Sequence, residues 1–265
     1  IIISQSGETA DTLAALKEAK KRGSHTLAIV NVVGSSIANA ADDVIYTWAG
    51  PEIAVATTKG YSTQLSVLYL FAVWAARLLK TADNARLDKI FDDILMLPEL
   101  TERVILAEPQ IKEMAKHCGD PKSLFFIGRN IDYAVSLEAS LKLKEISYIH
   151  SEAYAAGELK HGTISLIEEG RTVIALAAYE ELFDKLLSNI KEVKARGARV
   201  LACATVGHTE IAKEAESVIY IPKIDPLLLA SLEVVPFQLY AYYVALYNGC
   251  DIDKPRNLAK SVTVE

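Results

Sequence analysis

The sequence predicts an α/β protein with two consecutive doubly wound domains on parallel sheets, the first truncated at its N-terminus. One pattern repeats 174 residues later, where Lys17-Glu18 returns as Lys191-Glu192 and Val44-Ile45-Tyr46 returns as Val218-Ile219-Tyr220. Short β-branched runs alternate with helical patterns, which is typical of parallel strands covered by helices. A strand and a helix precede the second copy, and their counterparts would fall before residue 1. We therefore expect the first domain to lack its opening elements.

The first domain is predicted to end at residue 97. Its expected strands are short β-branched runs at residues 1–3, 26–31 and 43–47. A helix is predicted at residues 8–22, with Leu13 and Leu16 on its apolar face and Gly23 at its C-terminal cap. The pattern at residues 58–80 predicts a second, long helix that is mostly buried, because it is apolar along most of its length.

A helical connector at residues 84–118 leads into the second domain, residues 98–249, and we expect Pro98 and Pro109 to break it. The expected strands of this domain are residues 123–127, 172–177, 199–205 and 217–221, and its expected helices are residues 131–149, 180–196 and 227–249. Residues 250–265 form a polar tail that is too short for a domain. Such a tail is either coil or a strap over a site.

Composition limits the classes of partner. The chain has 265 residues, 51% of them hydrophobic, which suits two small domains with cores of their own. A net charge of −6 argues against a nucleic-acid surface, which needs a concentrated basic face. The longest apolar run, residues 65–76, suits a buried helix better than a membrane span. Three widely spaced cysteines form neither a disulfide framework nor a metal motif, so we expect a reducing, cytoplasmic compartment.

A loop of hydroxyl residues follows the first expected strand. Ser4-Gln5-Ser6-Gly7-Glu8-Thr9 places a glycine-bearing turn at the start of a helix, where free amides and the helix dipole favour an anion. The alternative is an ordinary helix cap with Ser6 or Thr9 as the N-cap residue. At the same 174-residue offset the second copy reads Ala178-Tyr179-Glu180-Glu181, without glycine, serine or threonine. Because a structural cap should survive duplication, this difference favours a single phosphate site.

Lys142 and Glu145 lie three residues apart in Leu141-Lys142-Leu143-Lys144-Glu145-Ile146-Ser147, so they share one face of the predicted helix. The simpler interpretation is a surface ion pair. However, apolar neighbours suggest a helix packed on several sides, where a carboxylate and an ammonium would be costly without a function.

His161, in Gly157-Glu158-Leu159-Lys160-His161-Gly162, is expected to be exposed at the end of a short helical turn. Histidine exchanges a proton near neutral pH, which makes it a candidate acid or base. An exposed histidine without such a role is the alternative.

Lys260 lies in the terminal segment Pro255-Arg256-Asn257-Leu258-Ala259-Lys260-Ser261-Val262-Thr263-Val264-Glu265, whose end alternates valine with other residues. That alternation suggests a tail that docks and closes the active site rather than one that frays. A docked lysine amine that loses its water is a nucleophile towards carbonyls. The alternative for Lys260 is a solvated charge.

Three segments, SQSGETADT, LKLKEISYIHSEAYAAGELKHG and PRNLAKSVTVE, closely resemble the isomerase part of the glucosamine-6-phosphate synthase family. The resemblance extends from Ile1 to Glu265 and implies two sugar-isomerase (SIS) domains. It implies an aminotransferase and ketose–aldose isomerase that converts fructose 6-phosphate and glutamine-derived ammonia to glucosamine 6-phosphate. It also implies a homodimer and, in the full-length protein, a glutaminase domain. No cofactor motif is present and the implied chemistry needs none.

The resemblance also implies a role for each candidate residue. Lys260 would form a Schiff base with C2 of the open sugar, and Glu145 would carry a proton between C1 and C2. Lys142 would assist near the sugar hydroxyls, and His161 would open the ring from the neighbouring subunit of the homodimer. The remaining substrate contacts implied by the family are the phosphate ligands Ser4, Gln5, Ser6 and Thr9 and the sugar contacts Val55, Thr57 and Ala259.

The chain departs from the family pattern at two residues and in its extent. Thr57 stands where serine is common, and Thr163 follows the His-Gly pair where proline is usual. The glutaminase domain and the first strand and loop of the isomerase part are absent from this sequence. We therefore expect this chain alone neither to hydrolyse glutamine nor to bind substrate at full strength. Two other functions stay open: an SIS-fold deaminase or deglycase of an amino-sugar phosphate, and a non-catalytic SIS module that senses sugar phosphate.

Overall fold

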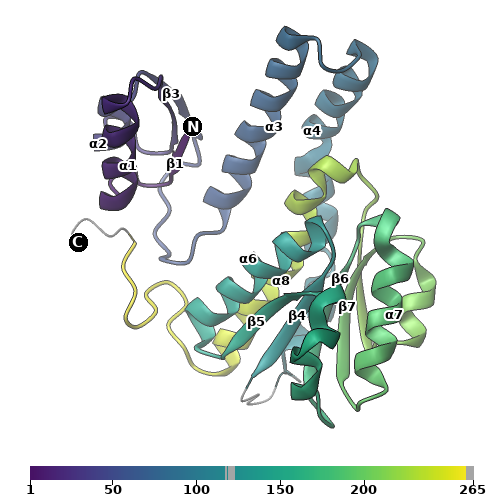
Figure 1. Ribbon diagram of the computed structural model, residues 1–265. Coiled ribbons are helices and arrows are strands. Elements are labelled where there is room, and N and C mark those ends of the chain that lie inside the picture. Colours follow the sequence, from purple (N-terminus) through teal and green to yellow (C-terminus); the bar gives the residue numbers. More distant parts are fainter. Residues whose placement is uncertain (117, 119–122, 261–265) are drawn as a thin grey trace. The chain divides into compact units, whose positions relative to one another are not determined.

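The computed structural model describes residues 1–116, 118 and 123–260, and divides the chain into two compact units (Figure 1). The first unit comprises Ile1–Phe91 with the terminal segment that starts at Asp253, and the second comprises Asp92–Ile252. The terminal residues Ser261, Val262, Thr263, Val264 and Glu265, on which part of the tail prediction depends, lie outside the described residues.

The first unit is built on a three-stranded parallel sheet in the order β1 (Ile2–Ser4), β2 (Leu27–Val30), β3 (Asp43–Tyr46). The strands lie within a residue or two of the predicted ones. Helices α1 (Ala10–Lys21) and α2 (Ser36–Ala40) pack on one face of the sheet (Figure 1). Their contact forms a small core of Leu16, Ala28, Val30, Ile37 and Ala38. This core fixes the place where β1 ends and α1 begins.

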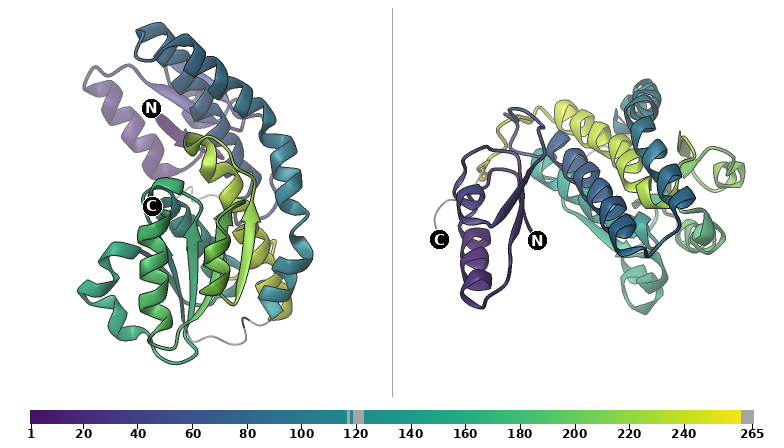
Figure 2. Two further views of the ribbon diagram at one scale, coloured as in Figure 1. Left: turned by 90° about the vertical axis from the view of Figure 1, so that its right-hand side faces the viewer. Right: turned by 90° about the horizontal axis from the view of Figure 1, so that it is seen from above.

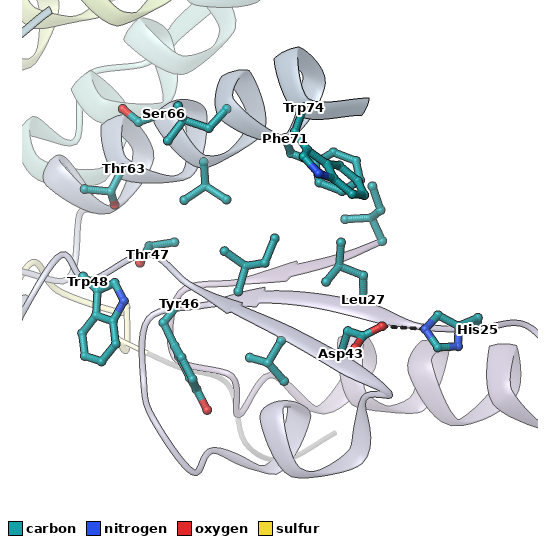
Figure 3. Close-up of a pocket in the computed structure, with 15 residues that line it drawn as sticks. His25, Leu27, Asp43, Tyr46, Thr47, Trp48, Thr63, Ser66, Phe71 and Trp74 are labelled. Carbon is teal, nitrogen blue, oxygen red and sulfur yellow. Dashed lines mark hydrogen bonds and ion pairs between the residues drawn. The ribbon is translucent and has the colours of Figure 1, made fainter. Parts of the chain in front are cut away.

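Helix α3 (Lys59–Leu79) lies within one residue of the predicted bounds at each end, but the prediction that it is mostly buried is wrong. Only Gly60 and Val73 of this helix are buried, whereas Trp74 and Leu79 are strongly exposed. The reason is a largely apolar cavity of about 970 Å³ lined by side chains of β2, β3 and α3 (Figure 3). The apolar side chains of the helix and of the sheet line this cavity instead of packing together.

Among the described residues, two segments are long and apolar enough to cross a membrane by length and composition, Lys59–Leu79 and Pro226–Tyr247. The apolar stretch of the second is 78% buried inside the structure, as expected for the core helix of a globular unit, whereas that of the first is 6% buried. Length and composition alone therefore do not identify either segment as a membrane span.

The connector contains two helices, α4 (Asn84–Ile105) and α5 (Glu108–Lys116). The prediction that Pro98 breaks the connector is wrong, because α4 continues through it. Pro109 lies in the first turn of α5, where backbone amides have no carbonyl partner within the helix, so proline is tolerated there. The break between the two helices falls at Leu106 and Ala107.

The second unit contains a five-stranded parallel sheet in the order β5-β4-β6-β7-β8, the order of a doubly wound fold. Its strands are β4 (Leu124–Gly128), β5 (Ser151–Ala155), β6 (Thr172–Ala177), β7 (Arg199–Thr205) and β8 (Ser217–Ile221). Helices α6 (Ile131–Ser147) and α8 (Leu229–Tyr247) lie on one face and α7 (Phe183–Lys194) on the other (Figure 2). Short 3-10 turns at Glu180–Leu182 and Pro226–Leu228 precede α7 and α8.

The sequence repeat is visible in the strand pairing. Leu27 pairs with Asp43 in the first unit, and Leu201 pairs with Ser217 in the second, 174 residues later. For the strand that precedes this pair in each copy, the offset is one residue smaller. Ser4 pairs with Val30 in the first unit, and the equivalent of Val30, Ala204, pairs with Ala177 rather than with Ala178. The loop comparison made from the sequence is therefore corrected by one residue. No described element of the first unit corresponds to β4, α6 and β5.

Candidate active site

The loop between β1 and α1 depends on a glycine at its centre. Gly7 has a φ of +68°, and a Cβ atom placed on it would lie 2.0 Å from Ser35 Oγ. The Gly7 carbonyl also accepts a hydrogen bond of 2.9 Å from the Ile37 amide. Both the backbone conformation and the close approach of α2 therefore require glycine here.

The hydroxyl groups of this loop hold its shape without capping α1. Ser4 Oγ accepts a hydrogen bond from the Gly7 amide at 3.1 Å and lies 3.2 Å from Thr9 Oγ1. Ser6 Oγ accepts a hydrogen bond from the Glu8 amide at 3.2 Å. Thr9 occupies the N-cap position, yet its side chain makes no capping bond. The amides of the first turn of α1, which have no carbonyl partner within the helix, are therefore not occupied by the Thr9 hydroxyl.

Glu8 turns away from this loop. Its carboxylate accepts a hydrogen bond from the Ser36 amide at 2.8 Å, and hydrogen bonds from Ser36 lower the pKa of Glu8. The negative charge of Glu8 is thereby bound to the start of α2 rather than to the start of α1.

Gln5 connects this loop with α3. Its Oε1 accepts a hydrogen bond from Gln64 Nε2 at 3.2 Å, and its Nε2 is buried without a hydrogen-bond partner among the described residues. A Cβ atom on Gly60 would lie 2.8 Å from this Nε2 and 2.8 Å from Thr57 Cγ2. Gly60 thus allows Gln5 and Thr57 to meet at the first turn of α3.

The terminal segment docks against the loop that precedes α3. The Val55 amide donates a hydrogen bond of 3.0 Å to the Asp253 carbonyl. Lys260 Nζ donates to the Ala54 carbonyl at 2.7 Å and to Thr57 Oγ1 at 3.4 Å. Ala259, the neighbour of Lys260, is exposed. The first unit therefore brings Lys260, Val55 and Thr57 together.

Glu52 is a residue of this site that the sequence analysis missed. Its Oε2 accepts a hydrogen bond of 2.9 Å from Lys260 Nζ, and its Oε1 accepts hydrogen bonds from the Thr58 and Gly60 amides at 3.0 and 3.2 Å. Burial acts to raise the pKa of Glu52, but the hydrogen bonds from Lys260 and the two amides outweigh it and lower that pKa. The sequence signal was weak, because the partners are 208 residues apart.

In the second unit, α6 carries a buried lysine between two partly buried carboxylates. Lys142 Nζ lies 2.6 Å from Glu145 Oε2 and 3.5 Å from Glu138 Oε1. The lysine side chain is only 6% exposed, so this is not the surface ion pair of the simpler interpretation. Burial raises the pKa of Glu138 against the opposing effect of Lys142. Glu138 was not recognised in the sequence, although it lies one helical turn before Lys142.

His161 ends a 3-10 turn, Ala156–His161, and is exposed, as the sequence predicts. The turn is anchored by the buried Ala156 and Leu159. The guanidinium of Arg129 packs on Gly157, where an added Cβ atom would lie 3.1 Å from its nearest nitrogen. Lys142, Glu145 and His161 belong to the second unit, whereas Lys260 and the Ser4–Thr9 loop belong to the first.

The cavity in Figure 3 is a different feature from these groups. It is lined by aromatic and aliphatic residues such as Tyr46, Trp48, Phe71 and Trp74, and none of the candidate site residues lines it. Its lining carries few groups that could bind a phosphate.

Comparisons with known proteins identify the family of this chain. A family model described as "SIS domain" matches residues 1–74 and 119–247. The chain is 57% identical over all of its length to a glutamine–fructose-6-phosphate aminotransferase (isomerizing) of Clostridium tetani, and 56% identical to that of Clostridium acetobutylicum. It spans 44% of the length of each of these curated relatives.

Two solved structures show the same fold. The C-terminal domain of a glucosamine-fructose-6-phosphate aminotransferase from Francisella tularensis is 35% identical, with a TM-score of 0.91. That match covers 96% of this chain and 72% of the other. A glucosamine-6-phosphate deaminase from Thermotoga maritima is 27% identical, with a TM-score of 0.76 over 98% of this chain and 74% of the other.

Proposed function

Because this chain belongs to the SIS domain family, and within it to the glutamine–fructose-6-phosphate aminotransferases, we propose that it is the isomerase part of such an enzyme. It would convert fructose 6-phosphate and ammonia to glucosamine 6-phosphate, with a glutaminase domain of the full-length protein supplying the ammonia. The observation that carries the proposal is the position of Lys260. Its amine contacts Ala54 and Thr57 in the loop before α3, and Thr57 meets Gln5 of the hydroxyl-rich loop at Gly60.

The phosphate would bind at the start of α1. Ser4, Ser6 and Thr9 supply hydroxyl groups, Gln5 supplies a buried amide nitrogen without a partner among the described residues, and the helix dipole favours an anion. Val55, Thr57 and Ala259 would contact the sugar beside Lys260. The absence of a capping bond from Thr9 supports this assignment over a purely structural cap.

Lys260 would act as the nucleophile. Its nitrogen bonds to C2 of the open sugar, the C2–O bond breaks, and water leaves, so that a protonated imine forms. Ammonia then replaces the lysine nitrogen at C2. The imine withdraws electrons from the adjacent C1–H bond, which makes that proton removable without a metal.

Glu145 would take the proton from C1 and return it to C2, which yields an amine at C2 and an aldehyde at C1. Lys142 contacts Glu145 at 2.6 Å and would hold it in place and meet sugar hydroxyls. His161 would open the sugar ring from the partner subunit of a homodimer, which its exposed position permits. The free cysteines, of which Cys118 and Cys203 are buried, support a reducing, cytoplasmic location.

The test is to trap the Schiff base in the full-length protein. Borohydride reduction in the presence of fructose 6-phosphate should add one hexose-phosphate mass to the peptide that contains Lys260. The Lys260→Arg variant keeps the charge but removes the nucleophile, so it should lose turnover and retain phosphate binding. Lys21→Arg, an exposed change in α1, is the control. Normal turnover in Lys260→Arg, or an adduct on Lys142 or Lys144, would disprove the assignment.

The likeness to the Thermotoga maritima deaminase favours one alternative, a deaminase of an amino-sugar phosphate. The same protein should then release ammonia from glucosamine 6-phosphate faster than it forms that sugar. A module that only senses sugar phosphate would bind the sugar and give no borohydride adduct.

A further inference from the structure

Glu52 connects two parts of the first unit that are far apart in the sequence. One carboxylate oxygen accepts hydrogen bonds from the Thr58 and Gly60 amides at the start of α3, and the other accepts the hydrogen bond from Lys260. The Glu52 side chain is 5% exposed, whereas that of Lys260 is 31% exposed. The carboxylate is therefore fixed by the protein, and the lysine reaches it from the more open side.

The groups around the Lys260 nitrogen define the role of Glu52. Lys260 Nζ donates hydrogen bonds to Glu52 Oε2 and the Ala54 carbonyl, and it lies 3.4 Å from Thr57 Oγ1, which can donate or accept. The hydrogen bonds that lower the pKa of Glu52 also keep it ionised. A carboxylate of this kind is a poor base but a good partner for a positive charge.

We propose that Glu52 positions the Lys260 nitrogen for attack on the sugar carbonyl and balances the positive charge that this nitrogen carries in the ammonium and again in the protonated imine. This inference rests on the proposed function, because it assigns a role to Glu52 within that site.

The charge balance of the reaction supports this role. Overall, an ammonium and a ketone give a protonated imine and one water. The ammonium gives up one proton, its lone pair forms the N–C2 bond, the C2–O bond breaks, and two of the three nitrogen protons end in the water. The positive charge is on the same nitrogen before and after the step. A carboxylate fixed 2.9 Å from that nitrogen can thus stabilise the product as well as hold the reactant. No oxidant, metal or further reactant is required.

Glu52→Gln separates this role from the capping of α3. The glutamine Oε1 can still accept hydrogen bonds from the Thr58 and Gly60 amides, but its NH₂ group would face the lysine ammonium as a second donor. In the full-length protein we expect the thermal midpoint to stay close to that of the parent. We expect the rate of borohydride trapping at Lys260 by fructose 6-phosphate to fall at least about tenfold. kcat should fall with it, whereas KM should change little.

Two variants sharpen this experiment. Glu52→Asp keeps the charge with a shorter reach, so it should be trapped faster than Glu52→Gln. Glu18→Gln removes the exposed partner of Arg22 in the same unit and should react at the parent rate. Equal trapping in Glu52→Gln and the parent would overturn the proposal, as would trapping in Glu52→Asp that is no faster than in Glu52→Gln.

Chemical labelling of Lys260 in the absence of sugar tests the role of Glu52 independently of the proposed function. Trinitrobenzenesulfonate reacts with lysine amines regardless of substrate. Because Glu52→Gln releases the ammonium from its partner, labelling of Lys260 should become several-fold faster than in the parent. If the parent gives no sugar adduct, the proposed function fails, and unchanged labelling in Glu52→Gln would separately show that Glu52 does not hold the lysine.

Discussion

The two units end their equivalent strands differently. In the first, β1 leads into Gln5-Ser6-Gly7-Glu8-Thr9, and by strand register the counterpart after β6 is Ala178-Tyr179-Glu180-Glu181-Leu182. The Tyr179 amide, which corresponds to that of Ser6, donates to the two carboxylate oxygens of Asp132 at 3.1 and 3.2 Å. The second unit thus places a carboxylate of its own where the first has a loop suited to an external anion.

Asp132 is part of a buried acid pair. It is 1% exposed at the start of α6, and Glu233 of α8 is fully buried beside it. Burial raises the pKa of Asp132 to about 8 and that of Glu233 well above its usual value. Glu233 interacts with the Asp132 carboxyl and with the Ala178 amide, and burial favours the neutral form of both acids. This comparison supports the proposal that, of the two strand-to-helix turns, the one in the first unit receives the ligand.

The comparison extends to the loop before the long helix. At the 174-residue offset, Pro226 stands in place of Glu52 and the buried Val234 in place of Gly60. The proline side chain has no oxygen that could accept a hydrogen bond from a lysine. The valine side chain would occupy the space that Gly60 leaves for Gln5 in the first unit. The lysine-binding loop is therefore specific to the first unit.

The largest effect is expected from Gly7→Ala. A Cβ atom at a φ of +68° and 2.0 Å from Ser35 Oγ should destabilise the first unit by on the order of 2–5 kcal/mol and abolish hexose-phosphate binding. The matched change in the second unit is Glu180→Ala, which removes only an exposed ion pair with Lys223. Thermal unfolding and calorimetric titration would measure both effects. Equal losses in the two variants would remove the distinction between the loops.

The acid pair should make stability depend on pH. The pKa of Asp132 is higher in the folded than in the unfolded protein, so folding retains a proton that the unfolded chain releases. The stabilisation is complete below pH 4 and is lost as the pH rises through about 8, by up to a few kcal/mol. Cys203 of β7 and Tyr179 are further titratable groups near the pair, and both have raised pKa values, Cys203 chiefly because it is buried and Tyr179 chiefly because of its hydrogen bond to Glu181.

Asp132→Asn should flatten this dependence in urea unfolding between pH 5 and pH 9. Asp184→Asn, an exposed change at the start of α7, should leave the dependence as it is in the parent. A parent protein whose stability rises over this range would contradict the buried pair.

Binding of sugar phosphate should weaken when the hydroxyl groups of the first loop are removed. Ser6→Ala combined with Thr9→Ala should lower hexose-phosphate affinity about tenfold or more, because hydrogen bonds to a charged group contribute about 1.5–3 kcal/mol each. Tyr179→Phe removes a hydroxyl from the counterpart of Ser6 and should not change the affinity. If the hydroxyls only capped the helix, the double variant would lose thermal stability and keep its ligand.

Most of the fold could be predicted because its strands are continuous apolar runs. Strand β5 and helix α2 were missed, since β5 reads Ser-Glu-Ala-Tyr-Ala at a sheet edge and α2 has only five residues. The burial of α3 was overestimated because composition reports how apolar a helix is and not what covers it. Neither Glu52 nor Asp132 could be found from the sequence, since their partners lie on other elements of the fold.

The smallest effect is expected from Thr57→Ser, the change towards the residue common in the family. Serine keeps the hydroxyl that lies 3.4 Å from Lys260 Nζ and loses the methyl group that packs beside Gly60. Loss of one methyl group should cost no more than about 1 kcal/mol, so kcat and KM should each change less than about fivefold. Its counterpart in the second unit is Ser231, which is already a serine. Thr57→Ala, in contrast, removes the Lys260 contact and should slow borohydride trapping more than Thr57→Ser does. If the two variants behaved alike, the methyl group rather than the hydroxyl would be the part of Thr57 that the first unit requires.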